Sequence, residues 1–227
     1  MNYKILVMNK FKLIIFIGVF GFVLIPLALI GCATTAKNIK TAEKLSELEM
    51  ESSIIYGQIK WLEHGEEKKV GKKFMGKSVT PHLIKIEDKT RIIGEVSEGG
   101  QFVWSLKPGK YFIYKMHYRD SWSGNYFVIP KVAFDVPKNG NSYYIGTLKC
   151  EFEPKRDFLG TVSGGVVFSI LDEDDIYFSN FKEKFSITPK EIEKSLMIHD
   201  SRLPQAIETT KEFNLAVSII NAILLGI

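Results

Sequence analysis

The chain has 227 residues, of which 45% are apolar and 25% are charged, and its formal net charge is +4. This composition is that of an ordinary globular protein, and it excludes a wholly disordered chain, a collagen-like repeat and a protein that crosses a membrane many times. Residues 1–31 contain three lysines and no acidic residue, so the rest of the chain carries 27 basic and 26 acidic residues. Because the basic excess lies in the N-terminal segment, we expect no nucleic-acid partner.

The N-terminal segment has the order of regions that is typical of a secretory signal. Residues 1–12 carry the three lysines, and the 18 residues from 13 to 30 carry no charge. They end in Leu29-Ile30-Gly31-Cys32, after which the chain turns polar. This ending resembles a bacterial lipobox: a leucine three residues before a cysteine, and a small residue directly before it.

The lipobox resemblance implies cleavage before Cys32, a diacylglyceryl thioether on its sulfur and acylation of the new amino group. Several acyl chains hold a protein to a membrane far more firmly than one. We therefore expect a signal peptide over 1–31 and a cell-envelope lipoprotein, on the outer membrane if the host has two membranes and otherwise on the outer face of the cell membrane. The alternative is an uncleaved signal anchor, because 18 apolar residues reach the lower limit for a spanning helix.

The next two segments are predicted to be a tether and a β-domain. Residues 32–52 begin with small polar residues and continue in a stretch too short for a stable isolated helix, which predicts a tether. Residues 53–171 alternate short apolar strands with turns at about 8–12-residue intervals, which predicts one antiparallel sandwich or barrel. The clearest strands are 54–62, 101–106, 111–118, 132–136, 142–152 and 166–171.

Two turns in this domain have specific residue chemistry. Lys107-Pro108-Gly109-Lys110 predicts a tight turn, with glycine at a position that needs a positive φ. The pair Asn139-Gly140 predicts a hairpin between the strands on either side. In the second of these strands, a two-residue period places Tyr144, Leu148, Cys150 and Phe152 on one face. Cys150 is therefore expected to be a small buried hydrophobic residue.

Two stretches carry a family resemblance: Ile55-Tyr56-Gly57-Gln58-Ile59, and the run from Gly99 through Phe102, Trp104, Leu106, Pro108-Gly109 and Tyr111 to Ile113. Together they resemble the prealbumin-like (transthyretin-like) domains, which include the regulatory-like domain of carboxypeptidases and bacterial lipoproteins. The resemblance covers roughly 53–153 and implies a mainly β, antiparallel prealbumin-like sandwich. Its motif is a strand–turn–strand packing motif without enzymatic residues, so no activity follows from it.

Residues 172–227 are predicted to be a helical extension. Four acids, Asp172–Asp175, complement the start of a helix, and their spacing is not that of an EF-hand calcium loop. Thr188-Pro189-Lys190-Glu191 is a capping box that predicts a helix burying Ile192 and Leu196. A last helix carries an apolar stripe of Phe213, Val217, Ile220 and Leu224. It either docks on the sandwich or faces the membrane or a partner protein.

A search for catalytic patterns leads to the expectation of no catalytic residue, no metal and no cofactor. The four histidines (His64, His82, His117 and His199) are scattered, and their spacing matches no short metal-binding motif. The sequence also lacks a nucleophile elbow, a phosphate-binding loop and a dinucleotide fingerprint.

One loop has the composition of a recognition surface, because it combines aromatic, charged and flexible residues. Its candidate binding residues are Arg119, Asp120, Trp122, Asn125 and Tyr126. The competing interpretation is a long hairpin loop in which Trp122 folds back onto the core. The expected function is therefore a membrane-anchored, non-enzymatic binding or structural module. The alternatives are an accessory subunit of an envelope complex that docks through the C-terminal helix, and a hydrolase with a dispersed site.

Overall fold

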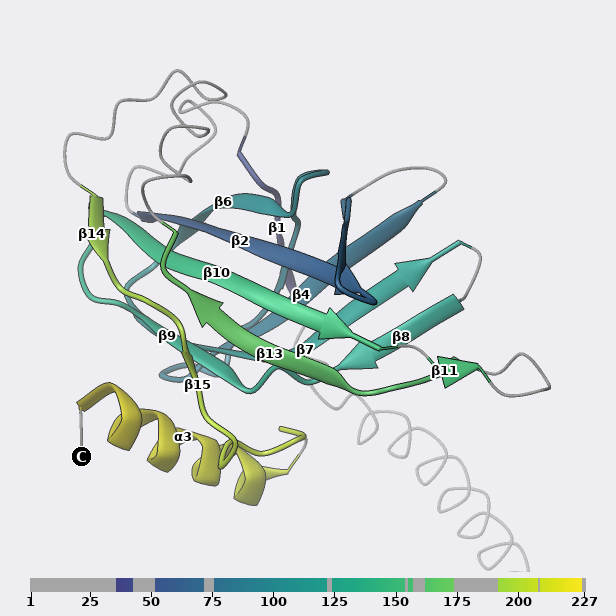
Figure 1. Cartoon of the computed structure of the whole chain (residues 1–227). Coiled ribbons are helices and arrows are strands. Elements are labelled where there is room, and N and C mark those ends of the chain that lie inside the picture. Colours follow the sequence, from purple (N-terminus) through teal and green to yellow (C-terminus); the bar gives the residue numbers. More distant parts are fainter. Residues whose placement is uncertain are drawn as a thin grey trace, which may run out of the picture. The chain divides into compact units, whose positions relative to one another are not determined.

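The computed structural model describes residues 36–42, 52–71, 76–121, 124–153, 155–156, 162–173, 192–207 and 209–225. The predicted signal peptide, the lipobox residues Leu29, Ile30, Gly31 and Cys32, and the loop residue Trp122 lie outside the described residues. The described part of the chain is mainly β, as predicted, with two sheets and a C-terminal helix (Figure 1).

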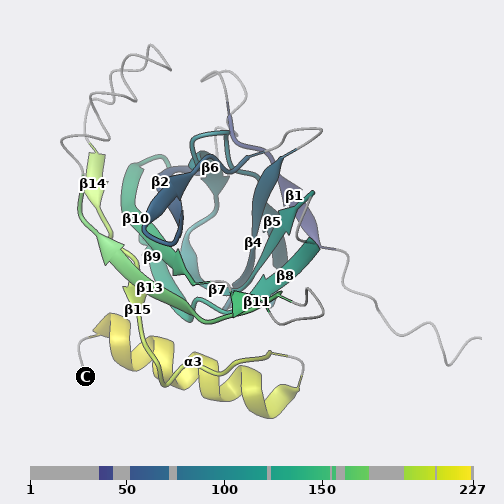
Figure 2. The ribbon, with the colours of Figure 1, turned by 45° about the vertical axis from the view of Figure 1, so that its right-hand side comes forward.

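The strands of the described residues form two sheets that pack face to face (Figures 1 and 2). Sheet A has the order β1 (Lys37–Ile39), β5 (Arg91–Gly94), β4 (Lys77–Lys85), β7 (Gly109–Asp120), β9 (Val132–Val136) and β15 (Ile198–His199), and β8 (Gly124–Val128) pairs with β7. Sheet B has the order β13 (Val166–Leu171), β10 (Ser142–Phe152), β2 (Ser53–Glu63) and β3 (Glu66–Lys68), with β6 (Gln101–Leu106) on β2 and β14 (Ile192–Lys194) on β10. The short strands β11 (Lys155–Arg156) and β12 (Val162–Ser163) pair with each other.

Both sheets are mixed, so the prediction of an antiparallel sandwich is wrong on this point. The long strands β2 and β10 run parallel at the centre of sheet B, and β1 runs parallel to β5 in sheet A. Parallel neighbours need a connection that leaves the sheet and returns to it. The chain makes such connections because β6 belongs to sheet B, β7 and β9 to sheet A, and β10 again to sheet B.

The two predicted turns carry the chain from one sheet to the other. Gly109 and Gly140 have the positive φ angles, +145° and +75°, that only glycine adopts readily. The hairpin predicted at Asn139-Gly140 is nevertheless wrong, because β9 pairs with β7 and β15 whereas β10 pairs with β2, β13 and β14. The turn chemistry is local and was predicted, but the pairing of the flanking strands is not local.

The main core lies between the sheets, and a second core covers the far face of sheet A. Strand β7 contributes to both: Tyr111, Ile113, Met116 and Tyr118 face sheet B, and Phe112 faces the C-terminal helix. The first part of this strand, around Tyr111–Ile113, is therefore buried on both faces. The inward-facing set also changes parity between Ile113 and Met116, because the register between β4 and β7 shifts there, so no single two-residue period in the sequence indicates the inner face.

A β-bulge in β10 changes which side chains share a face. The register with β2 shifts between Tyr144 and Thr147, and Gly146 within the bulge has a φ of +90°. The bulge adds one residue, so Tyr144 lies on the outer face of sheet B while Leu148, Cys150 and Phe152 lie in the main core. The predicted alignment of Tyr144 with these three residues is therefore wrong, whereas the predicted burial of Cys150 is confirmed.

The segment 192–199 forms strands where the sequence predicts a helix. Ile192–Lys194 is β14, parallel to β10, and the backbone N–H groups of Ser195 and Met197 donate to the carbonyls of Tyr144 and Ile145 at 2.9 and 2.8 Å. The helix that the capping box predicts over Ile192 and Leu196 is therefore wrong. The edge of β10 offers unpaired backbone groups, and pairing with them outweighs a local helix signal.

The predicted last helix is confirmed as α3 (Thr210–Leu225). A reciprocal capping box starts it, in which the Thr209 N–H donates to the Glu212 carboxylate and the Glu212 N–H donates to the Thr209 hydroxyl. Phe213, Ala216 and Ile220 are buried against Ile84, Ile86, Phe112 and Ala133 of sheet A and its turn. Among the described residues, no helix combines the length and apolar character that a membrane crossing requires.

The body of the protein begins earlier in the chain than the first predicted strand. Residues 36–42 fall within the segment predicted to be a tether, yet Lys37–Ile39 is β1 of sheet A. The Ala42 side chain is buried, and its N–H donates to the Val103 carbonyl at 2.9 Å. Three residues, 33–35, therefore separate Cys32 from the first described residue, Ala36.

Candidate functional site

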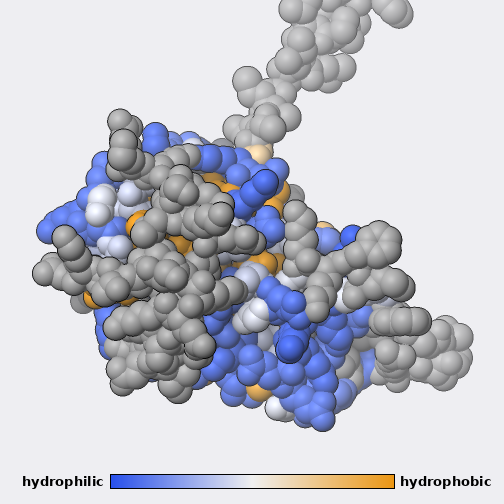
Figure 3. Space-filling model, turned by 90° about the horizontal axis from the view of Figure 1, so that it is seen from above, coloured by the Kyte–Doolittle hydropathy of each residue, from blue (hydrophilic) through white to orange (hydrophobic). Residues whose placement is uncertain are grey.

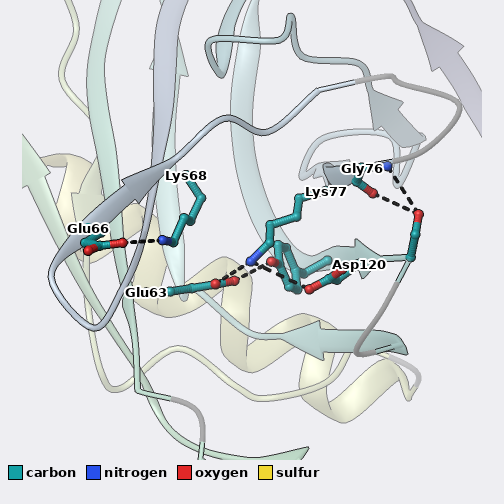
Figure 4. A network of polar contacts seen from close by, with 8 residues as sticks. Glu63, Glu66, Lys68, Gly76, Lys77 and Asp120 are labelled. Carbon is teal, nitrogen blue, oxygen red and sulfur yellow. Dashed lines mark hydrogen bonds and ion pairs between the residues drawn. The ribbon is translucent and has the colours of Figure 1, made fainter.

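The densest group of interacting polar side chains among the described residues joins the two sheets at one end (Figure 4). We call it the cross-sheet ion cluster; its members are Glu63 at the end of β2, Lys77 at the start of β4, and Tyr118 and Asp120 at the end of β7. Lys77 donates to the Glu63 carboxylate and lies 3.6 Å from an Asp120 oxygen. The Tyr118 hydroxyl donates to the other oxygen of Glu63.

The alternation of each strand places these polar groups on the core side. Glu63 continues the inward face of Ile59 and Trp61, and Lys77 continues that of Val79 and Leu83. An inward-facing charged residue at the end of an apolar face was a signal present in the sequence. Glu63, Lys77 and Tyr118 were nevertheless not among the residues predicted for a site.

An aromatic group borders the cross-sheet ion cluster on its core side. The Trp61 and Tyr118 rings are stacked, with centroids 4.3 Å apart and planes 7° apart, and Phe152 and Tyr126 adjoin them. Such rings exclude water from one side of the cluster, which strengthens the attraction between its charges and makes any unpaired charge there costly.

The pKa shifts in the cluster keep its groups in fixed protonation states. Burial alone would raise the pKa of the Glu63 carboxyl, but the hydrogen bonds from Lys77 and Tyr118 outweigh it and hold that pKa below its ordinary value. Burial, and then the hydrogen bond to Glu63, raise the pKa of the Tyr118 hydroxyl. At neutral pH the carboxylate is ionised and the phenol protonated. The Glu63 carboxylate and the Tyr118 hydroxyl therefore hold the two sheets together through charge and hydrogen bonding. Both pKa values are shifted away from neutral pH, so neither group exchanges a proton readily there.

A cavity of about 400 Å³ adjoins the cluster. Ser78 and Arg119 line it. Ser78 directly follows Lys77 in β4, and Arg119 directly precedes Asp120 in β7. Asn38 and Lys40 add polar groups from the β1 side. Glu95 also lines the cavity, so two cations, one acid and several neutral polar groups surround it, a set suited to a small polar ligand.

The structure separates the residues of the predicted recognition loop. Arg119 lines the cavity, and Asn125, its register partner on β8, is exposed. Asp120 points to the other side of the sheet, is 8% exposed and belongs to the cross-sheet ion cluster. The Tyr126 ring packs on Tyr118 and Phe152. The strand alternation therefore leaves two of these residues on the ligand-accessible side and places two in the interior.

The predicted docking stripe lies on α3. Phe213 and Ile220 are buried against sheet A, and Val217 and Leu224 are partly buried beside them. This apolar face is thus occupied by the protein's own sheet. Only the opposite side of the helix, which includes Leu215, is open to a membrane or a partner.

Two of the four histidines, His82 and His117, lie on the outer face of sheet A, where they bear on the alternative of a hydrolase. The His117 ring is stacked on the exposed Phe127 ring at 4.7 Å, and the Lys115 ammonium lies 4.8 Å from the Phe127 centroid. Burial, with smaller contributions from Lys115 and His117, lowers the pKa of His82 to about 4. His82 is therefore neutral at neutral pH, and the nearby Lys115 ammonium further disfavours its protonation.

Metal ligands and external relatives add no further assignment. Within the part of the chain that the structure describes, no group of three or more His, Cys, Asp or Glu side chains is arranged to hold a metal ion. No protein-family model, curated protein or solved structure matches this chain.

Proposed function

We propose that this protein is a cell-envelope lipoprotein, held to a membrane through an acylated Cys32, whose β-body acts as a non-enzymatic binding or structural module. The observation that carries the proposal is the N-terminal order of three lysines, 18 uncharged residues and Leu29-Ile30-Gly31-Cys32. Depending on the host, the location is the outer membrane or the outer face of the cell membrane.

Two features of the body support a binding or structural role. The polar groups of the cross-sheet ion cluster satisfy one another, which favours a rigid scaffold. The adjoining cavity, with Arg119 and Lys40 on its lining, is the binding site that we assign to the module. Its ligand class is small and polar, because the lining supplies two cationic side chains, the acidic side chain of Glu95 and neutral hydrogen-bonding groups.

We further propose that the sandwich has the prealbumin-like arrangement that the sequence resembles. The motif from Gly99 to Ile113 forms β6, the Pro108-Gly109 turn and the first part of β7. This unit connects sheet B to sheet A. Its position supports the proposal, because the motif of the resemblance is a strand–turn–strand unit that packs two layers together.

The test is mass spectrometry of the N-terminal peptide from protein made in a bacterial host, with Cys32→Ser as the matched variant. The expected result is a wild-type peptide that begins at Cys32 and carries a diacylglyceryl group and an N-acyl chain, and a variant that is neither processed nor acylated. An intact Met1 or a free thiol at Cys32 in the wild type would refute the lipoprotein proposal.

A further inference from the structure

We infer that the body lies against the membrane in one orientation, with one end of the sheets and the outer face of α3 on an anionic phospholipid surface. This inference rests on the proposed anchor at Cys32. It adds to that anchor a second, non-covalent contact made by named residues of the folded body.

The end of the sheets that we assign to the membrane is the one at which β1 starts. Lys37 of β1 is in register with Ile92 of β5, and Arg91 of β5 is in register with Ile84 near the end of β4. The end of β4 is in register with the start of β7, because Lys85 pairs with Tyr111. We call this end, which also carries the turns 86–90 and 107–108, the lysine end.

The short connection to Cys32 keeps the lysine end close to the lipid. Four residue steps separate Cys32 from Ala36, and an extended chain spans at most ~3.6 Å per residue, so these two residues lie within about 14 Å of each other. A body on so short a connection cannot present an arbitrary surface to the bilayer. The surface around the start of β1 is the one that the connection brings nearest.

The charge of the lysine end suits anionic headgroups. Lys37, Lys85 and Lys107 line one cavity of about 200 Å³, together with a single acidic residue, Asp88. Asp88 is paired with Lys85 at 3.6 Å, and its carboxylate also accepts a hydrogen bond from the Thr90 N–H. The cavity therefore has an excess of cationic side chains, the pattern that binds a lipid phosphate.

The other acidic residue of the same turn is also engaged. The Glu87 carboxylate accepts a hydrogen bond from the Lys110 N–H at 2.8 Å. Lys89, which is exposed, extends along α3, where its ammonium lies 4.5 Å from the Phe213 ring centroid. Lys89 of this end thus borders the helix directly.

The outer face of α3 supplies the apolar part of the contact. The helix packs on the part of sheet A nearest the lysine end, through Ile84, Ile86 and Phe112. From Phe213 to Leu225 it has no charged residue, and its solvent side carries Leu215 and Leu225, which are 50% and 65% exposed. An uncharged helical face with protruding leucines, bordered by lysines, is suited to the headgroup layer.

The side of the body away from α3 has a different character. Figure 3, which views the body from above in the orientation of Figure 1, shows a mostly hydrophilic surface wherever described residues are visible. Hydrophobic atoms appear there only in small patches between hydrophilic ones.

The test uses the full chain, acylated in a bacterial host and reconstituted into vesicles of phosphatidylethanolamine with a minority of phosphatidylglycerol. Leu215→Cys, carrying an environment-sensitive fluorophore, is compared with Val167→Cys, which places the same probe at a 65% exposed site on sheet B. Cys150 is fully buried and does not compete for the label. We expect nitroxide lipids to quench the probe at 215 several-fold more than the probe at 167.

Charge dependence is the second readout. Replacing phosphatidylglycerol with phosphatidylcholine, or introducing Lys107→Glu, is expected to reduce quenching at 215 and to leave quenching at 167 unchanged. Equal quenching at the two sites in floated, acylated protein would overturn the inference. Shielding of residue 215 in intact cells without quenching in vesicles would also overturn it, in favour of a protein partner.

Acylation of Cys32 is measured separately from the orientation of the body. Protein without an introduced cysteine takes no label if Cys32 is acylated, and it floats with the vesicles. A labelled Cys32 and protein that fails to float would refute the proposed anchor itself. Acylated, floated protein whose residue 215 is not quenched would refute only the membrane-facing orientation.

Discussion

Replacing Lys77 with methionine tests whether the cross-sheet ion cluster stabilises the packing of one sheet on the other. The substitution keeps most of the side-chain volume and removes the only cation that contacts both Glu63 and Asp120 in the described structure. The two carboxylates then lose the cation that lies between them. The chain is expected to fold and to be less stable.

The size of the effect follows from burial. Breaking a fully buried pair by removing one partner costs about 3–5 kcal/mol. The side chains of Lys77, Glu63 and Asp120 are 26%, 14% and 9% exposed, so solvent screens part of the loss and we expect about 2 kcal/mol. For a chain of this size that corresponds to a melting temperature lower by about 4–8 °C.

The stability lost in Lys77→Met is expected to depend on pH. The pKa of Glu63 is lowered in the folded protein, so its pairing stabilises the fold above the ordinary carboxyl pKa and is lost as pH falls through the lowered value. In Lys77→Met, burial dominates and the pKa of Glu63 rises. The stability difference between wild type and variant is therefore largest at neutral pH and shrinks below about pH 4.

The assay is urea unfolding of the detergent-solubilised protein at pH 7 and at acidic pH, followed by tryptophan fluorescence. Lys68→Met is the matched control, because the Lys68–Glu66 pair lies on the surface, where solvent screens the attraction between its charges. The double variant Lys77→Met/Glu63→Gln should recover part of the stability. Equal losses for Lys77→Met and Lys68→Met, or a loss independent of pH, would refute the reasoning.

Three further predictions concern the strand bulge, the helix and the free thiol. Gly146→Ala should lower the free energy of unfolding by about 2 kcal/mol, because φ is +90° there and the new methyl group would lie 3.2 Å from the Leu171 carbonyl oxygen. Gly165→Ala, where the methyl group would enter open space, should lower it by under about 0.5 kcal/mol in the same unfolding assay. Phe213→Ala should cost about 3–5 kcal/mol and Leu215→Ala under about 0.5 kcal/mol, so similar losses would contradict the docking of α3 on sheet A. Cys150 should react with a thiol reagent only after denaturation, because it is fully buried and burial raises its pKa; labelling of the native protein would show that the core opens.

The candidate site was only partly predictable. The loop composition pointed to Arg119, which does line the cavity, but it grouped Arg119 with Asp120, which the strand alternation turns to the opposite side. Glu63 and Lys77 are 14 residues apart and lie in different sheets. Their inward parity was visible in the sequence, whereas their partnership depends on how the two sheets are placed against each other.

Local chemistry determined the elements that the sequence predicted well. The strands 101–106, 132–136 and 166–171 were predicted with the bounds of β6, β9 and β13, because apolar alternation depends only on neighbouring residues. The last helix, the burial of Cys150 and the positive φ angle of Gly109 followed from patterns of equally short range.

Tertiary structure alone decided the pairing and the exceptions to alternation. The parallel pairing of β2 with β10, the bulge at Gly146 and the strand at Ile192–Lys194 each depend on a segment distant in the chain. The backbone of any strand can pair with any free edge, so the choice is made by which edges remain open once the core has packed. That choice depends on burying whole faces at once, and no short window of sequence contains it.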